Sequence, residues 1–179
     1  MTSKINKSWI ENWAGRYDYD YSEGDETRED RILKSVRELG RRPAFLTKPV
    51  VIDIVRWKSP RSTGYAEDNS PELVEDVTRA SFSAETEELK IGALTLMNGV
   101  GYRVASAILY FCDPERYTIM DWRAWASLKA FGEVEGEIED SFRCWQKYNE
   151  KCCRIAKRNR VSLRTLDKAL WKYKGGDDR

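Results

Sequence analysis

The stretch LMNGVGYRVASAILYFCDPERYTIMD, residues 96–121, decides the fold, and the rest of the chain is best interpreted outward from it. Gly99 and Gly101 allow a tight backbone turn, because glycine has no Cβ and lets the backbone approach a ligand closely. Apolar residues then recur at helical spacing, at Val100, Val104, Ala105, Ile108 and Leu109. The preceding LKIGALTLM indicates a first helix, so residues 89–112 are predicted to form a helix, a hairpin and a second helix.

The predicted hairpin has the features of an anion site. The N-terminus of the helix that follows it offers backbone N–H donors and a favourable dipole, so phosphate is the natural ligand. A Gly-x-Gly turn alone is weak evidence, but two flanking helices make a unit that can grip a DNA strand through its phosphates without reading sequence. We expect these contacts from Asn98, Gly99, Val100, Gly101 and Arg103.

Asp121 is the candidate reactive group of this segment. Pro114 disfavours helical geometry at Asp113, so the apolar helix is expected to end there. The short YTIM segment then leads to Asp121, and WRAWASL follows it. Asp121 should therefore open the next helix, where capping and the helix dipole both favour a carboxylate. It is either only a cap or also a reactive group, and its distance from the hairpin favours the second interpretation.

LMNGVGYRVASAIL followed by YTIMDWRA resembles the signature of the helix-hairpin-helix (HhH-GPD) superfamily of DNA glycosylases. This resemblance implies an all-α, two-lobed fold with a base-binding cleft between the lobes and with the hairpin on phosphate. It also implies that Asp121 is the catalytic carboxylate. In that role Asp121 would stabilise the positive charge that develops on the sugar, and would orient or activate the attacking water.

Three departures from the family pattern refine the expectation. Bifunctional members carry a lysine where this chain has Arg103, and a guanidinium stays protonated and cannot form a Schiff base. Asn98 stands where proline is common, which is compatible with a turn. The cysteines after Asp121 are one too few and wrongly spaced for an iron–sulfur cluster; they are Cys144, Cys152 and Cys153. We expect a monofunctional enzyme with no metal and no cofactor, apart from a candidate structural monovalent cation at the hairpin.

Excision of a base from duplex DNA requires a pocket for the flipped base and a side chain that fills the gap. The segment 57–69 occupies the place of a wedge loop, so Trp57, Lys58 and Arg61 are candidates for the cleft or the gap. Trp122 and Trp125 follow Asp121 and are candidates for the base pocket. Trp57 and Trp125 have an alternative interpretation as core aromatics.

Composition is consistent with an intracellular enzyme. The chain has 179 residues, which fits one domain over residues 1–179 or two small lobes. It contains no histidine, which excludes Ser-His and Cys-His dyads and His-ligated zinc. Four cysteines without framework spacing indicate reduced thiols. With no membrane-spanning run and no leader, we expect a cytoplasmic monomer.

The net charge of +1 is unevenly distributed. Residues 18–30 and 133–140 are acidic, whereas residues 41–61 and 151–179 are basic. The basic segments are candidate DNA surfaces, and the alternative is that they are solvated helix faces.

Helices are expected along most of the remaining chain. Thr47, Ser70, Ser83 and Ser162 are candidate N-caps, with Pro49 and Pro71 in the first turns that follow. Apolar stripes support these assignments; they comprise Val50, Val51, Ile54 and Val55, then Leu73, Val74, Val77 and Ala80, then Phe142, Trp145, Cys152 and Ile155, and finally Leu163, Leu166, Leu170 and Tyr173. Trp9, Trp13 and Tyr17 indicate an N-terminal helix.

Together these features predict a monofunctional glycosylase that binds double-stranded DNA, flips out a damaged or modified base and leaves an abasic site. An oxidised, alkylated or mismatched base and a bulky phage-modified cytosine all fit, so the role is in DNA repair or antiviral defence. Three alternatives stay open. They are a non-catalytic hairpin module, a bifunctional glycosylase/lyase that uses another lysine such as Lys58, and a helical scaffold without a nucleic-acid role.

Overall fold

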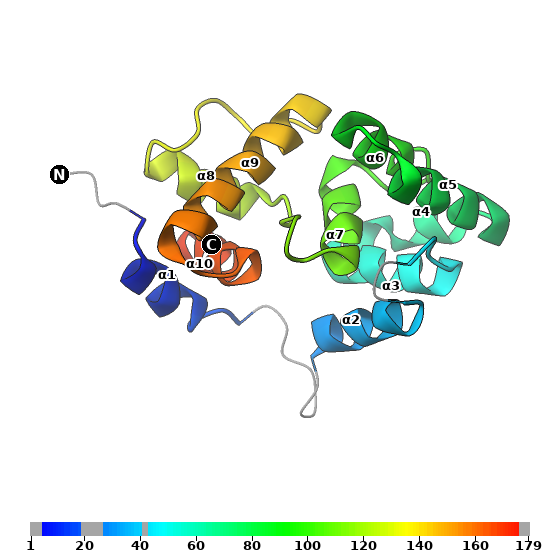
Figure 1. Cartoon of the computed structure of the whole chain (residues 1–179), viewed down its shortest axis with the longest axis horizontal. Helices are drawn as coiled ribbons and strands as arrows, with labels where there is room; N and C mark the ends of the chain where they lie inside the picture. The colour runs from blue at the N-terminus through cyan, green and yellow to red at the C-terminus, as the bar shows by residue number, and fades with distance from the viewer. Residues whose placement is uncertain (1–4, 19–26, 41–42, 176–179) are drawn as a thin grey trace. The chain divides into compact units, whose positions relative to one another are not determined.

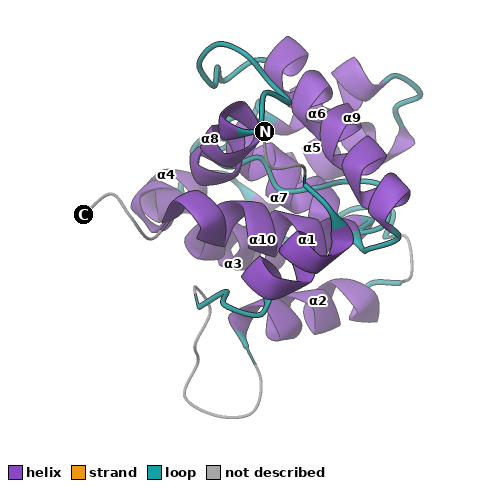
Figure 2. Ribbon diagram, turned by 90° about the vertical axis from the view of Figure 1, so that its left-hand side faces the viewer, coloured by secondary structure: helices purple, strands orange, loops and turns teal. Residues whose placement is uncertain are grey.

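The structure is a computed structural model that describes residues 5–18, 27–40 and 43–175. Within these ranges every regular element is a helix and there is no strand (Figure 2), so the predicted all-α class is confirmed. Most of the acidic segment 18–30 lies outside the described residues, as do the first two residues of the basic segment 41–61 and the last four of the basic segment 151–179.

The chain divides into two compact units. The terminal unit comprises residues 1–19 and 114–179, and the central unit comprises residues 20–113. The single domain and the cleft that the family resemblance implies stay predictions.

The central unit contains six α-helices and a short 3-10 helix in its described part. They are α2 (Arg28–Glu38), α3 (Lys48–Lys58), η1 (Pro60–Ser62), α4 (Thr63–Glu67), α5 (Pro71–Ser83), α6 (Glu87–Leu94) and α7 (Tyr102–Cys112). Helix α3 packs against α2, α4, α5 and α7, and α6 packs against both α5 and α7 (Figure 1). Eight consecutive residues of α7, from Val104 to Phe111, are buried. Helices α3 and α7 therefore form the centre of this unit.

The predicted caps of the central unit are partly correct. Ser70 caps α5 by accepting a hydrogen bond from the Leu73 N–H, and Thr47 stands at the N-cap of α3 without a side-chain bond. The prediction for Ser83 is wrong, because α5 continues through Ser83 and Thr86 caps α6 instead. The continuation follows from the inward face of α5, which extends from Val74 and Val77 to Ser81.

Two residues assigned to the inward face of α5 lie on its other side. Leu73 is 39% exposed and Ala80 is also exposed, whereas Val74 and Val77 are buried. The buried face therefore runs through Val74, Val77, Thr78 and Ser81. A small polar residue can take a core position when a backbone carbonyl accepts from it, as the Ser81 hydroxyl does with the Lys90 carbonyl at 2.6 Å.

The terminal unit contains α1 (Lys7–Ala14), α8 (Trp122–Ala130), α9 (Phe142–Asn159) and α10 (Leu163–Gly175). Helix α10 packs against each of the other three (Figure 1). Ser162 caps α10 as predicted, since its hydroxyl accepts from the Thr165 N–H, and the predicted leucine stripe of α10 is buried. Helix α1 ends at Ala14, so Tyr17 lies beyond the predicted N-terminal helix and packs edge-on against Trp171.

Candidate functional site

The hairpin of the central unit connects α6 to α7. Gly99 has φ +78, in the left-handed region that favours glycine, and Gly101 is the N-cap of α7 with φ −89. The Val100 N–H donates to the Met97 carbonyl at 3.2 Å and its side chain is buried. Val100 therefore anchors the turn from inside, and the helix begins at Tyr102 rather than at Val100.

Gly99 is required by its surroundings as well as by its φ angle. A Cβ built on Gly99 would lie 2.8 Å from the Ser62 carbonyl oxygen and 3.0 Å from the Ala66 nitrogen. Both atoms belong to the main chain, so neither can move aside as a side chain can. The hairpin thus lies directly against the backbone of η1 and α4, which any residue other than glycine would prevent.

Asn69 holds the hairpin against α4 through hydrogen bonds. Its Oδ1 accepts from the Asn98 N–H at 2.8 Å, and its Nδ2 donates to the carbonyls of Asn98 and Ala66, each at 3.0 Å. Asn69 is 2% exposed, so these bonds form away from water, where an unmade bond is costly. The sequence interpretation missed Asn69, because no local pattern marks a side chain that bonds main-chain atoms 29 positions away.

The N-terminus of α7 carries no cap of its own. No side chain accepts from its first turn, and the first turn holds no acid. The first N–H groups of a helix have no intrahelical acceptor, so this end can bind an external anion. Half-buried Arg103 lies in that first turn and forms no ion pair with any residue that the structure describes. The hairpin thus brings together Gly99, Val100, Gly101 and Arg103, whereas Asn98 takes part through its main chain.

Asp121 belongs to the terminal unit and is the N-cap of α8, as the sequence predicts. Its Oδ1 accepts from the Arg123 N–H at 2.9 Å. The four residues before it, 117–120, are all buried. Two side chains of α9 hold this segment, since Asn149 accepts from the Thr118 N–H at 3.0 Å and the Tyr148 hydroxyl donates to the Ile119 carbonyl at 3.2 Å. The half-buried Asp121 carboxylate therefore stands at the end of a well-held backbone.

Two side chains near Asp121 in the sequence or in the fold have distinctive surroundings, Arg123 and Tyr148. The Arg123 guanidinium lies 4.3 Å from the ring of Trp171 and 5.2 Å from that of Trp122. Burial raises the pKa of Tyr148 well above its usual range, and the nearby Cys152, Asp167 and Asp121 raise it further. Tyr148 therefore stays a neutral phenol at physiological pH and can act as a hydrogen-bond donor but not as a base.

Two of the predicted pocket tryptophans are core residues. Trp57 is 5% exposed and packs edge-on against Phe111, with ring centroids 5.2 Å apart. Trp125 is 4% exposed, stacks on Tyr148 and donates its Nε1–H to the Gly136 carbonyl at 3.2 Å. A side chain that fills a gap in DNA must be exposed, so the burial of Trp57 favours its core interpretation over the wedge. The alternative core interpretation holds for both rings, because spacing alone does not distinguish a pocket wall from a core position.

The other predicted pocket or wedge residues are more accessible. Trp122 is 47% exposed beside Asp121. Arg61 is exposed in η1, and Lys58 is half-buried at the end of α3. Trp57 is also among the residues that line a cavity of about 360 Å³; the others are Arg28, Arg31, Ile32, Ser35, Asp53 and Arg56. The sequence interpretation did not foresee this arginine-lined cavity, because α2 and α3 form it jointly.

All four cysteines are free thiols. Burial and the neighbouring Asp113 raise the pKa of Cys112 to about 12, so this thiol is a poor nucleophile. No group of three or more potential metal-ligating side chains occurs in the described part of the chain. No helix there is long and apolar enough to cross a membrane. The predictions of no iron–sulfur cluster and of a hairpin cation stay predictions.

No family model, curated protein or solved structure matches the chain. The resemblance to the HhH-GPD superfamily therefore rests on the sequence of residues 96–121. In the structure these residues form a glycine hairpin, a helix without a capping side chain, a buried segment and a carboxylate at the start of the next helix.

Proposed function

We propose that the protein is a monofunctional DNA glycosylase. The observation that carries the proposal is the continuous order of elements from the hairpin to Asp121. The uncapped α7 follows a hairpin with Gly99 in the left-handed region, and the buried segment 117–120 then presents Asp121 at the N-cap of α8. Base excision requires a grip on a phosphate and a carboxylate at the reacting sugar. The hairpin with α7 supplies the first, and Asp121 supplies the second.

The proposed partner is double-stranded DNA, bound through a backbone phosphate. The N–H groups at the start of α7 donate to the phosphate oxygens, and Arg103 adds a charge-assisted contact. Asn98, Gly99, Val100 and Gly101 provide the main chain of this site. Such contacts neutralise phosphate charge and release counterions, so affinity should fall steeply as salt rises.

The proposed reaction breaks the bond between C1′ of the sugar and the nitrogen of the base. The bonding electrons leave with the base, and positive charge develops on the sugar. The Asp121 carboxylate stabilises this charge and accepts a proton from the water that attacks C1′. The hydrogen bond from the Arg123 N–H fixes the orientation of the carboxylate. Arg103 cannot form a Schiff base, so the product is an intact abasic site.

The flipped base needs an apolar face to stack on, and Trp122 is an exposed ring adjacent in sequence to Asp121. Arg61 and Lys58 are the remaining candidates for the gap or the cleft. Damaged bases and bulky phage-modified cytosines both match this chemistry, so we propose a monomeric intracellular enzyme of repair or antiviral defence.

The test is an abasic-site assay on purified protein. The substrates are duplexes with oxidised, alkylated, deaminated or mismatched bases, and genomic DNA of phages with modified cytosines. We expect strand breaks only after alkali, and none with Asp121→Asn. Asparagine caps helices as well as aspartate does, so this variant should keep its fold. DNA binding without breaks on any substrate would indicate a non-catalytic hairpin module.

The bifunctional alternative has its own readout. A lyase that uses Lys58 would form a covalent protein–DNA adduct on reduction with borohydride. We expect no adduct with the unmutated protein. An adduct that disappears in Lys58→Arg would overturn the monofunctional assignment.

A further inference from the structure

We propose that the hairpin and the segment formed by η1 and α4 (residues 60–67) make one two-part grip, in which Arg61 and Tyr65 contact the same nucleic-acid strand as the hairpin. We call these two segments the strand grip. The inference rests on the proposed function and adds to it a second phosphate contact and a stacking contact. The central unit alone carries it, since all of these residues lie between positions 60 and 103.

The two segments are joined by main-chain contacts. The absence of a side chain at Gly99 lets the hairpin lie against the Ser62 carbonyl and the Ala66 nitrogen. Asn69 then bonds both main-chain groups of Asn98 on one side and the Ala66 carbonyl on the other. Since Asn69 is buried, the hairpin and the end of α4 are held to each other and present a single surface.

The charge of this surface suits a phosphate chain. Arg61 is exposed and forms no ion pair with any residue that the structure describes. Of the two exposed acids at the end of α4, Glu67 is paired with Arg56 at 3.4 Å, and Asp68 is the C-cap. The Lys48 ammonium donates to the Glu67 carbonyl at 2.7 Å. Arg61 can therefore act together with Arg103 and the N–H groups of α7 on neighbouring phosphates.

Tyr65 supplies an aromatic face at the same place. Its side chain is 66% exposed, and its Cβ lies 3.2 Å from the position that a Cβ on Gly99 would occupy. A large aromatic ring that is mostly exposed loses no internal packing when it stacks on a base. Base–aromatic stacking is tolerant of sequence and needs an unpaired base, which a duplex offers only where a nucleotide is flipped out or missing. Leu96, which precedes the hairpin, is also exposed, at 71%.

The test measures fluorescence anisotropy of a fluorescein-labelled duplex that contains a stable abasic-site analogue, over a range of salt concentrations. We expect Arg61→Ala to reduce the slope of log affinity against log salt by about one, as Arg103→Ala should. Tyr65→Ala should weaken binding roughly 5- to 50-fold with the slope unchanged, and Tyr65→Phe should restore it. Both side chains are exposed, so thermal melting should not change.

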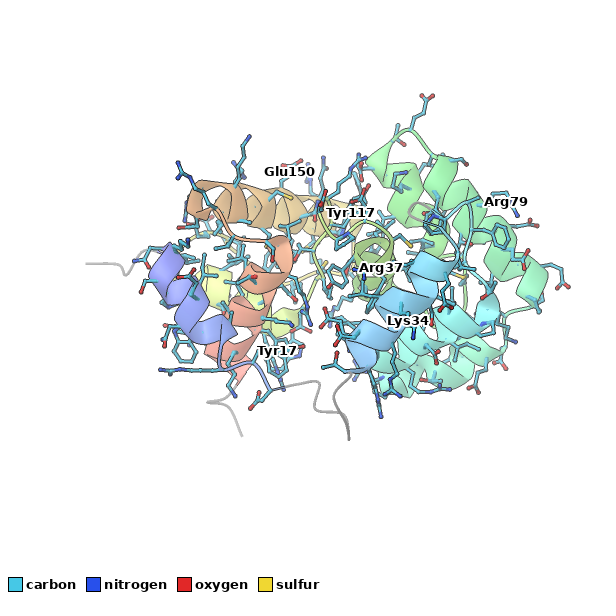
Figure 3. All side chains as sticks on the ribbon, turned by 60° about the horizontal axis from the view of Figure 1, so that its bottom comes forward. Tyr17, Lys34, Arg37, Arg79, Tyr117 and Glu150 are labelled. Carbon is cyan, nitrogen blue, oxygen red and sulfur yellow. The ribbon has the colours of Figure 1, made fainter. Side chains whose placement is uncertain are left out.

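Matched controls come from the same unit. Arg79 is an exposed arginine on α5 (Figure 3), and its guanidinium lies 4.3 Å from the ring centroid of Phe45. Leu73 is a partly exposed apolar residue of α5. Arg79→Ala and Leu73→Ala should leave both affinity and slope unchanged. A loss of affinity in these controls equal to that in Arg61→Ala and Tyr65→Ala would overturn the inference, since it would show binding by general charge and apolar surface.

The outcomes separate the inference from the proposed function. If Arg103→Ala weakens binding but Arg61→Ala and Tyr65→Ala do not, the strand grip is overturned and the proposed function stands. If the unmutated protein binds neither this duplex nor the corresponding single strand, both are overturned.

Discussion

The N-termini of α7 and α8 carry opposite electrostatic arrangements. Helix α7 begins after two glycines with no capping side chain and no acid, and it places Arg103 in its first turn. Helix α8 begins with Asp121, whose carboxylate accepts from the Arg123 N–H. A helix N-terminus favours negative charge in both cases. The N-terminus of α7 is therefore open to an external anion, whereas the N-terminus of α8 is occupied by the Asp121 carboxylate of the chain itself.

The two N-termini also differ in what holds them. Long-range contacts hold the hairpin before α7, through Asn69 and the packing of Gly99 on η1 and α4. Asp121 is held by its own cap and by the buried segment that precedes it, which Asn149 and Tyr148 of α9 hold in turn. A substitution in the hairpin or in the first turn of α7 should therefore change folding stability or DNA affinity. A substitution of Asp121 should change the rate of the chemical step.

The largest expected effect is the loss of activity in Asp121→Asn. The amide cannot carry the charge that stabilises the sugar, so single-turnover excision should slow roughly a hundred- to ten-thousand-fold. Thermal stability should stay unchanged because asparagine keeps the cap. Asp121→Ala should lose activity to a similar extent and also lose about 1 kcal/mol of stability with the cap. Equal stability of the two variants would show that the capping bond contributes nothing.

The next effect in size concerns the hairpin glycine. Gly99→Ala should destabilise the protein by about 1–3 kcal/mol, because a Cβ is disfavoured at φ +78 and would meet the Ser62 carbonyl. Gly92→Ala is the matched control, since Gly92 lies inside α6 and a Cβ there meets nothing within 4 Å. It should stabilise by up to about 1 kcal/mol. Chemical denaturation of both variants measures the difference, and the same sign for both would contradict the packing of the hairpin.

A smaller effect is expected at the first turn of α7. Arg103→Lys keeps the positive charge but replaces the planar fork by an ammonium, so DNA affinity should fall only a few-fold. The variant also places a primary amine where bifunctional glycosylases have one. Borohydride trapping of Arg103→Lys on a substrate duplex would indicate that residue 103 reaches C1′, whereas we expect this residue to contact phosphate and to give no adduct.

The smallest effect concerns the loop after α8. Partial burial raises the pKa of the Glu133 carboxyl, but hydrogen bonds from Arg158 and Lys151 of α9 outweigh it and lower the pKa below its usual value. A lowered pKa in the folded state contributes stability above the pKa of the unfolded chain, and this stability is lost as pH falls through the folded value. Glu133→Gln should cost about 0.5–1 kcal/mol at neutral pH.

The pH dependence provides the control for this prediction. The cost of Glu133→Gln should shrink as pH falls from the pKa of the unfolded chain through the lowered pKa of the folded state, and disappear once the carboxyl is protonated in both states. Denaturation curves at pH 7 and at acidic pH measure it. A cost that is the same at both values would mean that the ion pairs of Glu133 with α9 do not contribute.

Local signals made most of the fold predictable. Ser70, Ser162 and Asp121 were recognised as N-caps because capping depends on a side chain and the residues that directly follow it. Ser83 was misassigned because the competing signal, the inward face of α5, depends on packing. The resemblance to the HhH-GPD superfamily implies the all-α class, and helical periodicity and N-caps along the rest of the chain agree with it.

The candidate site was predictable where residues are close in sequence and not elsewhere. The hairpin and Asp121 were identified from spacing, whereas Asn69 and the contact of Gly99 with Ser62 join distant segments. Trp57 shows the same limit, since a tryptophan at a helix end has the same pattern in a core as in a pocket. Burial decides between them, and burial is a property of the folded chain.

The most direct test of the contrast between the two helix N-termini is single-turnover excision measured over a range of enzyme concentrations with the unmutated protein, Asp121→Asn and Arg103→Ala. It uses a substrate that the abasic-site assay identifies. Arg103→Ala should raise the concentration needed for half-saturation and leave the saturated rate unchanged, and Asp121→Asn should lower the saturated rate and leave half-saturation unchanged. Two variants that change the same parameter would contradict the division of roles between α7 and α8.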